Sequence, residues 1–329
     1  MSTVSRPSAR VVIVTRTKNR PRLLRRAIED ILQQTFEDWT LVVVNDGGES
    51  AEVDAVLADF QEQLAGRLLV LHHAESLGME AASNRGIAAA DSEYIAVHDD
   101  DDEWAPEFLA TTVAHLDSHP DDGGVTVETE IVFEKLTATG REVEERVIFE
   151  PQLHAITLVD QLHYNRFVPI SFLFRRSVYD ELGGFDESLA VVGDWEFHLR
   201  FLVRHHIGYI KGRPLAFWNQ RRGATDADAN SVIAGDLDHH VYSLKVRDRL
   251  VREHAAAYGL GPLVYQRELM AAEVGRFHAR IDELQRGQEA LLEEVRALRA
   301  ALDEERQARG AWSQLPGKAF QQARSALRR

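Results

Sequence analysis

The chain has no cysteine among its 329 residues, which excludes disulfides, thiolate nucleophiles and cysteine-based zinc sites. Any metal ion must therefore be held by oxygen or imidazole ligands. No apolar run reaches the roughly 18 residues of a membrane-spanning helix. The segment from Met1 to Arg10 is polar and lacks the apolar core of a secretory signal. We therefore expect a cytoplasmic protein.

Positive charge is scarce: the chain has 38 Lys and Arg residues but 53 Asp and Glu residues, which gives a net charge of −15. This balance argues against a nucleic-acid-binding protein. The basic residues gather early, however, because eight of them precede the first acid, Glu29: Arg6, Arg10, Arg16, Lys18, Arg20, Arg22, Arg25 and Arg26. Arg6 and Arg10 fit a solvated tail equally well. The others indicate a local basic patch beside an anion.

Strand and helix patterns alternate in the first third. Apolar runs typical of strands buried on both faces occupy residues 11–14, 41–44, 68–71 and 94–97. Helical spacing occupies residues 21–34, 52–64 and 81–90. This alternation predicts an α/β fold, with a mostly parallel sheet and helices on both faces. Ligands bind such sheets at the carboxyl ends of the strands, here near Thr15, Asn45, His72 and His98.

The middle third is less regular. Residues 125–133 and 143–149 are predicted as paired strands. Helices are predicted over residues 158–164, 176–182 and 194–205, with Gly183 ending the second.

The C-terminal part is predicted to be helical, with a heptad seam from Met270 to Leu302. The a positions are Val274, Ile281, Gln288, Val295 and Leu302, and the d positions are Met270, Phe277, Leu284, Leu291 and Leu298. This pattern favours a parallel two-stranded coiled coil and hence a homodimer. The alternative is one amphipathic helix packed on its own domain.

We expect five segments: an N-terminal tail (1–9), an α/β domain (10–235), a helical extension (236–265), a coiled coil (266–310) and a basic tail (311–329). The last segment is either a frayed terminus or a contact with the inner face of a membrane.

Four consecutive acids, Asp99 to Asp102, follow the fourth predicted strand. Adjacent carboxylates repel one another, and Mg²⁺ or Mn²⁺ would offset that repulsion while bringing phosphate oxygens to the site. The alternative is a solvated loop that caps the next helix.

Several segments then occur in a distinctive order. They are residues 11–21 (VVIVTRTKNRP), 42–47 (VVVNDG), 82–87 (ASNRGI), 94–102 (YIAVHDDDD), 183–187 (GGFDE) and 193–200 (GDWEFHLR). This set, which spans about residues 10–218, resembles the family 2 glycosyltransferases. The resemblance implies a Rossmann-like GT-A fold and an inverting, metal-dependent enzyme.

The resemblance also implies roles for particular residues. Asp46 would accept the N3–H of a pyrimidine base, and Asp194 would be the general base. Other donor contacts would be Thr15, Arg16, Thr17, Asn19, Asn84, Arg85 and Asp100. Asp99 and Asp101 would form the D-x-D pair, with Asp101 the more direct ligand of Mn²⁺ or Mg²⁺. The acceptor side would include Trp195, Glu196 and Arg221, with Glu196 as a substitute base.

Two positions depart from the family pattern. Gly193 stands where the family often has Glu, and Ser83 stands where it commonly has Arg. The expected arginine is then either shifted to Arg85 or missing. A histidine that some members use as a further metal ligand is also absent after Trp218.

The sequence therefore predicts transfer from a UDP- or dTDP-sugar to a saccharide or lipid-linked acceptor in cell-surface polysaccharide or glycoconjugate synthesis. One rival is a nucleotidyltransferase that makes a nucleotide sugar, but residues 16–20 lack the glycines of its phosphate loop. Another is a non-catalytic assembly protein with a degenerate α/β domain. The presence of Asp46, Asp99, Asp101 and Asp194 argues against it.

Overall fold

The computed structural model describes residues 8–137, 140–222 and 236–313. The chain divides into two compact units, Met1–Arg249 and Leu250–Arg329.

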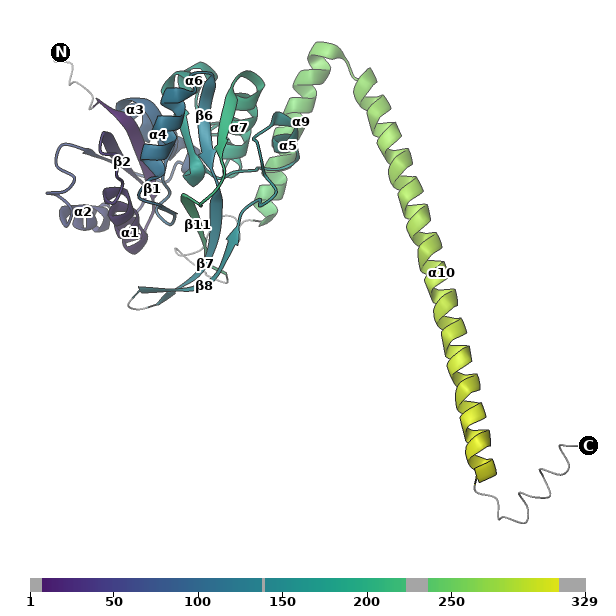
Figure 1. Cartoon of the computed structure of the whole chain (residues 1–329). Helices are drawn as coiled ribbons and strands as arrows, with labels where there is room; N and C mark the ends of the chain where they lie inside the picture. The colour runs from purple at the N-terminus through teal and green to yellow at the C-terminus, as the bar shows by residue number, and fades with distance from the viewer. Residues whose placement is uncertain (1–7, 138–139, 223–235, 314–329) are drawn as a thin grey trace, which may run out of the picture. The chain divides into compact units, whose positions relative to one another are not determined.

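A seven-stranded sheet forms the centre of the first unit (Figure 1). Its strand order is β10-β6-β9-β4-β1-β2-β3. The strands are β1 (Ser8–Thr17), β2 (Trp39–Asp46), β3 (Leu68–His73), β4 (Asp91–Val97), β6 (Asp122–Val127), β9 (Phe172–Arg175) and β10 (His206–Ile210). Only the pairs that β9 makes with β4 and β6 are antiparallel. The prediction of a mostly parallel sheet is confirmed.

Helices cover both faces of this sheet. Val11 and Ile13 of β1 join one apolar cluster, and the alternate residues Val12 and Val14 join the other. The first cluster includes α1 (Pro21–Leu32), α2 (Ser50–Ala58) and α4 (Phe108–Ser118). The second includes α3 (Met79–Ala89), α6 (Arg176–Leu182) and α7 (Gly193–Arg204). Because side chains alternate across a strand, continuous apolar runs supply both cores at once.

A second sheet extends the fold beside the first. Its order is β5-β11-β7-β8, with β5 (Glu103–Trp104), β11 (Ala216–Gln220), β7 (Thr129–Thr137) and β8 (Gly140–Ile148). The pairing of β7 with β8 is as predicted. The single strand expected over residues 125–133 is wrong, because the chain leaves the first sheet after Val127 and enters the second at Thr129. Glu128 between them stays paired, donating its N–H to Ile210 O of β10 at 2.9 Å.

Two short elements, α5 (Leu158–His163) and η1 (Pro169–Ser171), and the first part of α9 (Asp236–Tyr258) complete this unit. Helix α6 ends as predicted, at Gly183 in the left-handed region (φ 85°), which glycine adopts without strain.

The first part of α9 packs on the α/β unit. Arg247 donates to the carbonyls of Leu162 and His163 at 2.9 and 2.6 Å. Arg249 pairs with Asp186 and Glu196 at 2.5 and 2.7 Å. These contacts explain why the compact unit continues to Arg249 instead of ending near residue 235, where the sequence suggested a boundary.

The second unit contains one long helix, α10 (Gly261–Ser313), which spans 53 residues. Its expected d-position side chains, Met270, Phe277, Leu284, Leu291 and Leu298, are 60–66% exposed. Among the residues that the structure describes, no helix is both long and apolar enough to cross a membrane. Most of the predicted basic tail lies outside the described residues.

Candidate functional site

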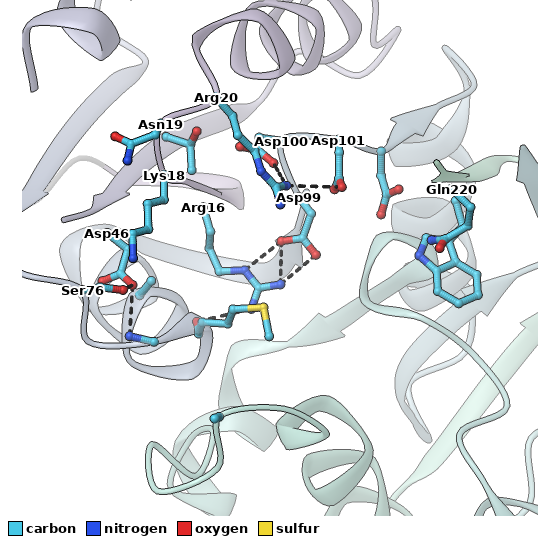
Figure 2. Close-up of a pocket in the computed structure, with 17 residues that line it drawn as sticks. Arg16, Lys18, Asn19, Arg20, Asp46, Ser76, Asp99, Asp100, Asp101 and Gln220 are labelled. Atoms are coloured by element: carbon cyan, nitrogen blue, oxygen red, sulfur yellow. Dashed lines mark hydrogen bonds and ion pairs between the residues drawn. The ribbon is translucent and has the colours of Figure 1, made fainter. Parts of the chain in front are cut away.

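A cleft of about 550 Å³ opens at the carboxyl ends of β1, β2 and β4 (Figure 2). Its lining comprises Arg16, Thr17, Lys18, Asn19, Arg20, Asp46, Ser76, Gly78, Met79, Ala82, Asp99, Asp100, Asp101, Asp102, Ala190, Trp218 and Gln220. Strand ends of an α/β sheet are where ligands usually bind. The structure thus brings together six of the predicted donor-site residues (Arg16, Thr17, Asn19, Asp46, Asp99 and Asp100) and the predicted metal ligand Asp101.

Asp46 and Ser76 lie together at one end of the cleft (Figure 2). The carboxylate of Asp46 accepts four hydrogen bonds, from His73, from the Ser76 hydroxyl and from the backbone N–H groups of Leu77 and Gly78, at 2.7–3.0 Å. Burial alone would raise the pKa of Asp46, but these donors outweigh it and hold the pKa below its ordinary value. Asp46 therefore fixes the loop after β3, and a bound base would have to replace one of these donors.

Arg16 and Asp99 face each other in the middle of the cleft (Figure 2). Arg16 Nη2 contacts both Asp99 oxygens at 2.5 and 2.7 Å, and its Nε contacts one at 2.8 Å. Arg16 Nη1 also donates to Met79 O and Ser83 Oγ at 3.3 Å. The guanidinium of Arg16 thus reaches from β1 to Ser83, the position at which the family pattern has arginine.

Arg20 holds the next two acids of the loop. Its Nη1 lies 3.0 Å from Asp100 Oδ1 and 3.3 Å from Asp101 Oδ2. Despite Arg20, burial raises the pKa of Asp100 to about 7, and the neighbouring Asp101 carboxylate adds to the shift.

Arg221 also contacts Asp101. Its Nη2 lies 2.5 Å from Asp101 Oδ2 and its Nη1 lies 3.1 Å from Glu134. The side chain of Arg221 is only 2% exposed and does not line the cleft. The prediction that Arg221 contacts the acceptor or the diphosphate is therefore not supported. It fixes Asp101 instead.

Asp99 and Asp101 are the carboxylates to consider for a metal. Among the described residues, no three His, Asp or Glu side chains are arranged as a metal site. Carboxylate oxygens beside a cleft that can admit a diphosphate nevertheless have the chemistry that Mg²⁺ and Mn²⁺ prefer. The residues fit such an ion if the ion pair between Arg16 and Asp99 breaks, and if Arg20 or Arg221 gives up its ion pair with Asp101 so that a carboxylate oxygen can bind the ion.

Asp194 lies in the first turn of α7, after Val192 in the left-handed region (φ 62°). Its Oδ2 accepts a hydrogen bond from Asn165 Nδ2 at 2.7 Å. Burial raises the pKa of Asp194, although the backbone N–H of Trp195 and the charge of Arg16 oppose the shift. Asp194 is not among the cleft-lining residues, but its charge acts on Arg16, which is. Its role as general base stays a prediction.

The two residues after Asp194 turn away from the cleft. Trp195 is buried and its Nε1 donates to Gln161 O at 2.7 Å. Glu196 is 4% exposed and pairs with Arg200 and Arg249 at 2.8 and 2.7 Å. The structure therefore does not support either as an acceptor contact, or Glu196 as a substitute base.

Three predicted donor contacts do not line the cleft. Asn84 anchors the loop after α6, since it bonds to Phe185 and to the Tyr179 hydroxyl. Arg85 is exposed on α3. Thr15 is fully buried.

Sequence reasoning assigned no role to several lining residues, notably Lys18, Arg20, Ser76, Trp218 and Gln220. For Lys18 and Arg20, the cluster of basic residues at positions 16–20, here called the basic loop, pointed to an anion site without giving a role to either residue. It also missed Glu80 of α3, which is 5% exposed and lies beside Arg16 and Asp194, because an acid in the first turn of a helix looks ordinary in sequence.

Known proteins share this architecture. The sequence model of glycosyl transferase family 2 matches residues 12–183. The chain is 29% identical over 192 residues to the uncharacterized glycosyltransferase YwdF of Bacillus subtilis, covering 58% of this chain and 67% of YwdF. It is 36% identical over 100 residues to the putative colanic acid biosynthesis glycosyl transferase WcaA of Escherichia coli, covering 30% of this chain and 35% of WcaA.

Solved structures agree on the fold. The crystal structure of residues 1–349 of Staphylococcus aureus TarS in complex with UDP-GlcNAc superposes with a TM-score of 0.54 at 16% identity. The match covers 76% of this chain and 75% of that one. At this identity the likeness shows a shared GT-A fold.

Proposed function

We propose that this chain, which belongs to glycosyl transferase family 2, moves a sugar from a UDP- or dTDP-sugar to a hydroxyl of a saccharide or lipid-linked saccharide, with inversion. The observation that carries the proposal is the grouping of Arg16, Arg20, Asp99 and Asp101 around one cleft, with Asp194 near enough for its charge to act on Arg16. The complex of TarS with UDP-GlcNAc supports a nucleotide-sugar donor. The name of WcaA supports a role in cell-surface polysaccharide synthesis.

The donor would lie along the cleft, with its base towards Asp46 and its diphosphate beside the basic loop that contains Arg16, Lys18 and Arg20. These cations would balance the diphosphate charge that grows as the glycosidic bond breaks. A divalent ion held by Asp99 and Asp101 would offset the same charge.

Asp194 would act on the acceptor. Its carboxylate takes the proton of the acceptor hydroxyl while that oxygen attacks the anomeric carbon and the nucleoside diphosphate leaves. Asn165 fixes the orientation of this carboxylate through the 2.7 Å hydrogen bond to Oδ2.

A donor panel tests the proposal. The protein is incubated with UDP- and dTDP-sugars and Mn²⁺, and the release of nucleoside diphosphate is measured. We expect release from at least one donor, loss of release in EDTA, and recovery when Mn²⁺ or Mg²⁺ is added back. Full release in EDTA would overturn the metal assignment. Pyrophosphate release from a nucleoside triphosphate and a sugar 1-phosphate would favour the nucleotidyltransferase instead. No turnover in any assay would favour the assembly protein.

Helix α10 supports a second proposal, that two copies of the chain join in a parallel coiled coil. Its heptad seam is self-complementary, and β-branched a residues with Leu at d favour two strands. Each exposed Leu or Val on the seam gains about 1.5–3 kcal/mol on burial. At about 1.5 Å per residue, α10 could act as a stalk about 80 Å long.

Light scattering on the full chain tests the dimer. We expect Leu284→Asp with Leu291→Asp, both at d positions, to give a monomer at micromolar concentration. The matched control, Ala290→Asp with Ala297→Asp, adds the same charge off the seam and should remain dimeric. A monomeric wild-type chain would contradict the proposal and leave a helix that packs on its own domain.

We propose the cytoplasm as the location, with contact at the inner membrane face when the acceptor is lipid-linked. Vesicle flotation of the full chain with anionic lipid tests the contact. Recovery of the protein only in the unbound fraction would contradict it.

A further inference from the structure

Glu80 is a buried acid for which donor binding and proton transfer, as described above, assign no role. It lies in the first turn of α3 and is 5% exposed. Within the described part of the chain, its carboxyl makes no hydrogen bond or ion pair. Burial raises the pKa of Glu80 to about 8; Arg16 opposes the shift, whereas Asp194 and Asp99 add to it. A carboxyl buried without a bonded partner is costly, so a functional reason for its retention is expected.

Glycine at 193 is what makes room for Glu80. A Cβ atom on Gly193 would lie 2.4 Å from both Cδ and Oε1 of Glu80, and 2.6 Å from Cγ. Gly193 does not have a left-handed φ, so its backbone would accept any residue. The space is therefore taken by the Glu80 side chain, which lies against the first residue of α7.

Arg16 reaches the same helix as Glu80, because its Nη1 donates to Met79 O and Ser83 Oγ of α3 at 3.3 Å. Both carboxylate oxygens of Asp99 accept hydrogen bonds from Arg16. After Asp99, Glu80 is the carboxyl whose charge acts most strongly on the Arg16 guanidinium. When Asp99 turns towards the donor, Arg16 loses its ion pair. Glu80 then remains to keep it in place.

We propose that Glu80 is a positioning residue for transfer: when Asp99 turns from Arg16 to the donor, the carboxyl of Glu80, which lies against Gly193, pairs with Arg16 and keeps it beside the start of α7, which carries Asp194. The inference rests on the proposed function. Two contacts support it: the carboxyl of Glu80 fills the space beside Gly193, and the guanidinium of Arg16 reaches the same helix, α3, at Ser83 Oγ.

Glu80→Gln tests the carboxyl with little change of shape. Losing the pairing with Arg16 that the proposal assigns to the donor-bound state predicts a fall of about 10-fold or more in kcat. Affinity for UDP, measured by calorimetry, should change less than about threefold, because Asp46 and the basic loop are intact. The melting temperature should not fall. The control Glu52→Gln removes an exposed charge on α2 and should match wild type. Wild-type kcat in Glu80→Gln would overturn the proposal.

Moving the acid tests its position. Gly193→Glu alone should be poorly stable, because it meets Glu80, and Glu80→Ser alone should be folded but slow. Glu80→Ser combined with Gly193→Glu restores an acid at the same place, and its kcat should exceed that of Glu80→Ser by about 10-fold. A double variant no faster than Glu80→Ser would overturn the proposal.

A melting-temperature cycle separates this inference from the proposed function. Gly193→Ala should destabilise wild type but not Glu80→Ser, since the clash needs both side chains. If Gly193→Ala lowered the melting temperature equally in wild type and in Glu80→Ser, the contact between Gly193 and Glu80 would be refuted, even if no donor were found. A wild-type protein that turns over no donor, with the cycle intact, would refute the proposed function alone.

Discussion

In the acidic loop, Asp99 to Asp102, Asp99 pairs with the guanidinium of Arg16. Asp101 pairs with the guanidinium groups of Arg20 and Arg221. Near the start of α7 the balance differs. Asp194 receives a side-chain hydrogen bond only from the neutral amide of Asn165 within the described residues, and Glu80 receives none. The acidic loop is rich in paired charges. On the α7 side Glu196 pairs with Arg200 and Arg249, but Asp194 and Glu80 are buried carboxyl groups without an ion pair in the described residues.

The difference indicates a division of labour. A guanidinium group that pairs with a carboxylate can instead pair with the phosphate oxygens of a donor, so the acidic loop suits donor binding. Burial also raises the pKa of Asp100 in the acidic loop, but that carboxylate pairs with Arg20. On the α7 side, Asp194 and Glu80 have raised pKa values and no ion pair within the described residues. A general base works best when its pKa is near the operating pH, so this side suits proton transfer.

The largest effect should come from Asp194→Asn, which keeps the shape and removes the proton acceptor. We expect kcat to fall by about 10²–10⁴ while UDP affinity stays unchanged. Steady-state rates together with calorimetry measure both quantities. Near wild-type turnover would show that the base is another group.

Asp101→Asn should weaken the use of the donor. It leaves the buried Arg221 without its closest carboxylate, and it removes the proposed metal ligand. We expect kcat/KM for the donor to fall about 10- to 100-fold, with a lower melting temperature. The control is Asp59→Asn, which removes an exposed pair with Arg25 that should contribute little. Unchanged donor kinetics would remove Asp101 from the site.

A smaller effect is expected from Asn165→Ala, which deletes the hydrogen bond to Asp194. The amide favours the ionised form of Asp194, so its loss should raise the pKa of the base and lower kcat about 10-fold. The pH dependence of kcat distinguishes this from general damage, because its acidic limb should move to higher pH. A lower rate with an unmoved limb would show a structural role only.

The smallest effect is expected from Arg85→Ala. Arg85 is exposed on α3 and does not line the cleft, so donor KM and kcat should stay within about twofold. A large rise in donor KM would restore the sequence-based prediction for this residue.

Local patterns predicted the sheet and its helices because apolar periodicity depends only on neighbouring residues. The runs at residues 11–14 and 41–44 became strands buried on both faces, and Gly183 ended α6 as expected. The break at Glu128 was missed because its partner strand, β10, lies far along the chain.

The site was predictable as a set of loops but not as a set of contacts. Arg16 reaches Ser83 of α3, and Glu80 fills the space that Gly193 leaves, yet neither contact is visible in sequence spacing. Arg221 looked like a ligand contact because it is basic and near the site. Its burial against Glu134 and Asp101 depends on two other strands and a loop.

The pH dependence of kcat at saturating donor and acceptor tests the division between the two sides most directly. Asp194 can accept a proton only when ionised, and burial raises its pKa, so the rate should rise with pH along an acidic limb centred above the ordinary Asp value of about 4. The residual activity of Asp194→Asn should lack that limb. A limb at the ordinary Asp value, or the same limb in Asp194→Asn, would contradict the account.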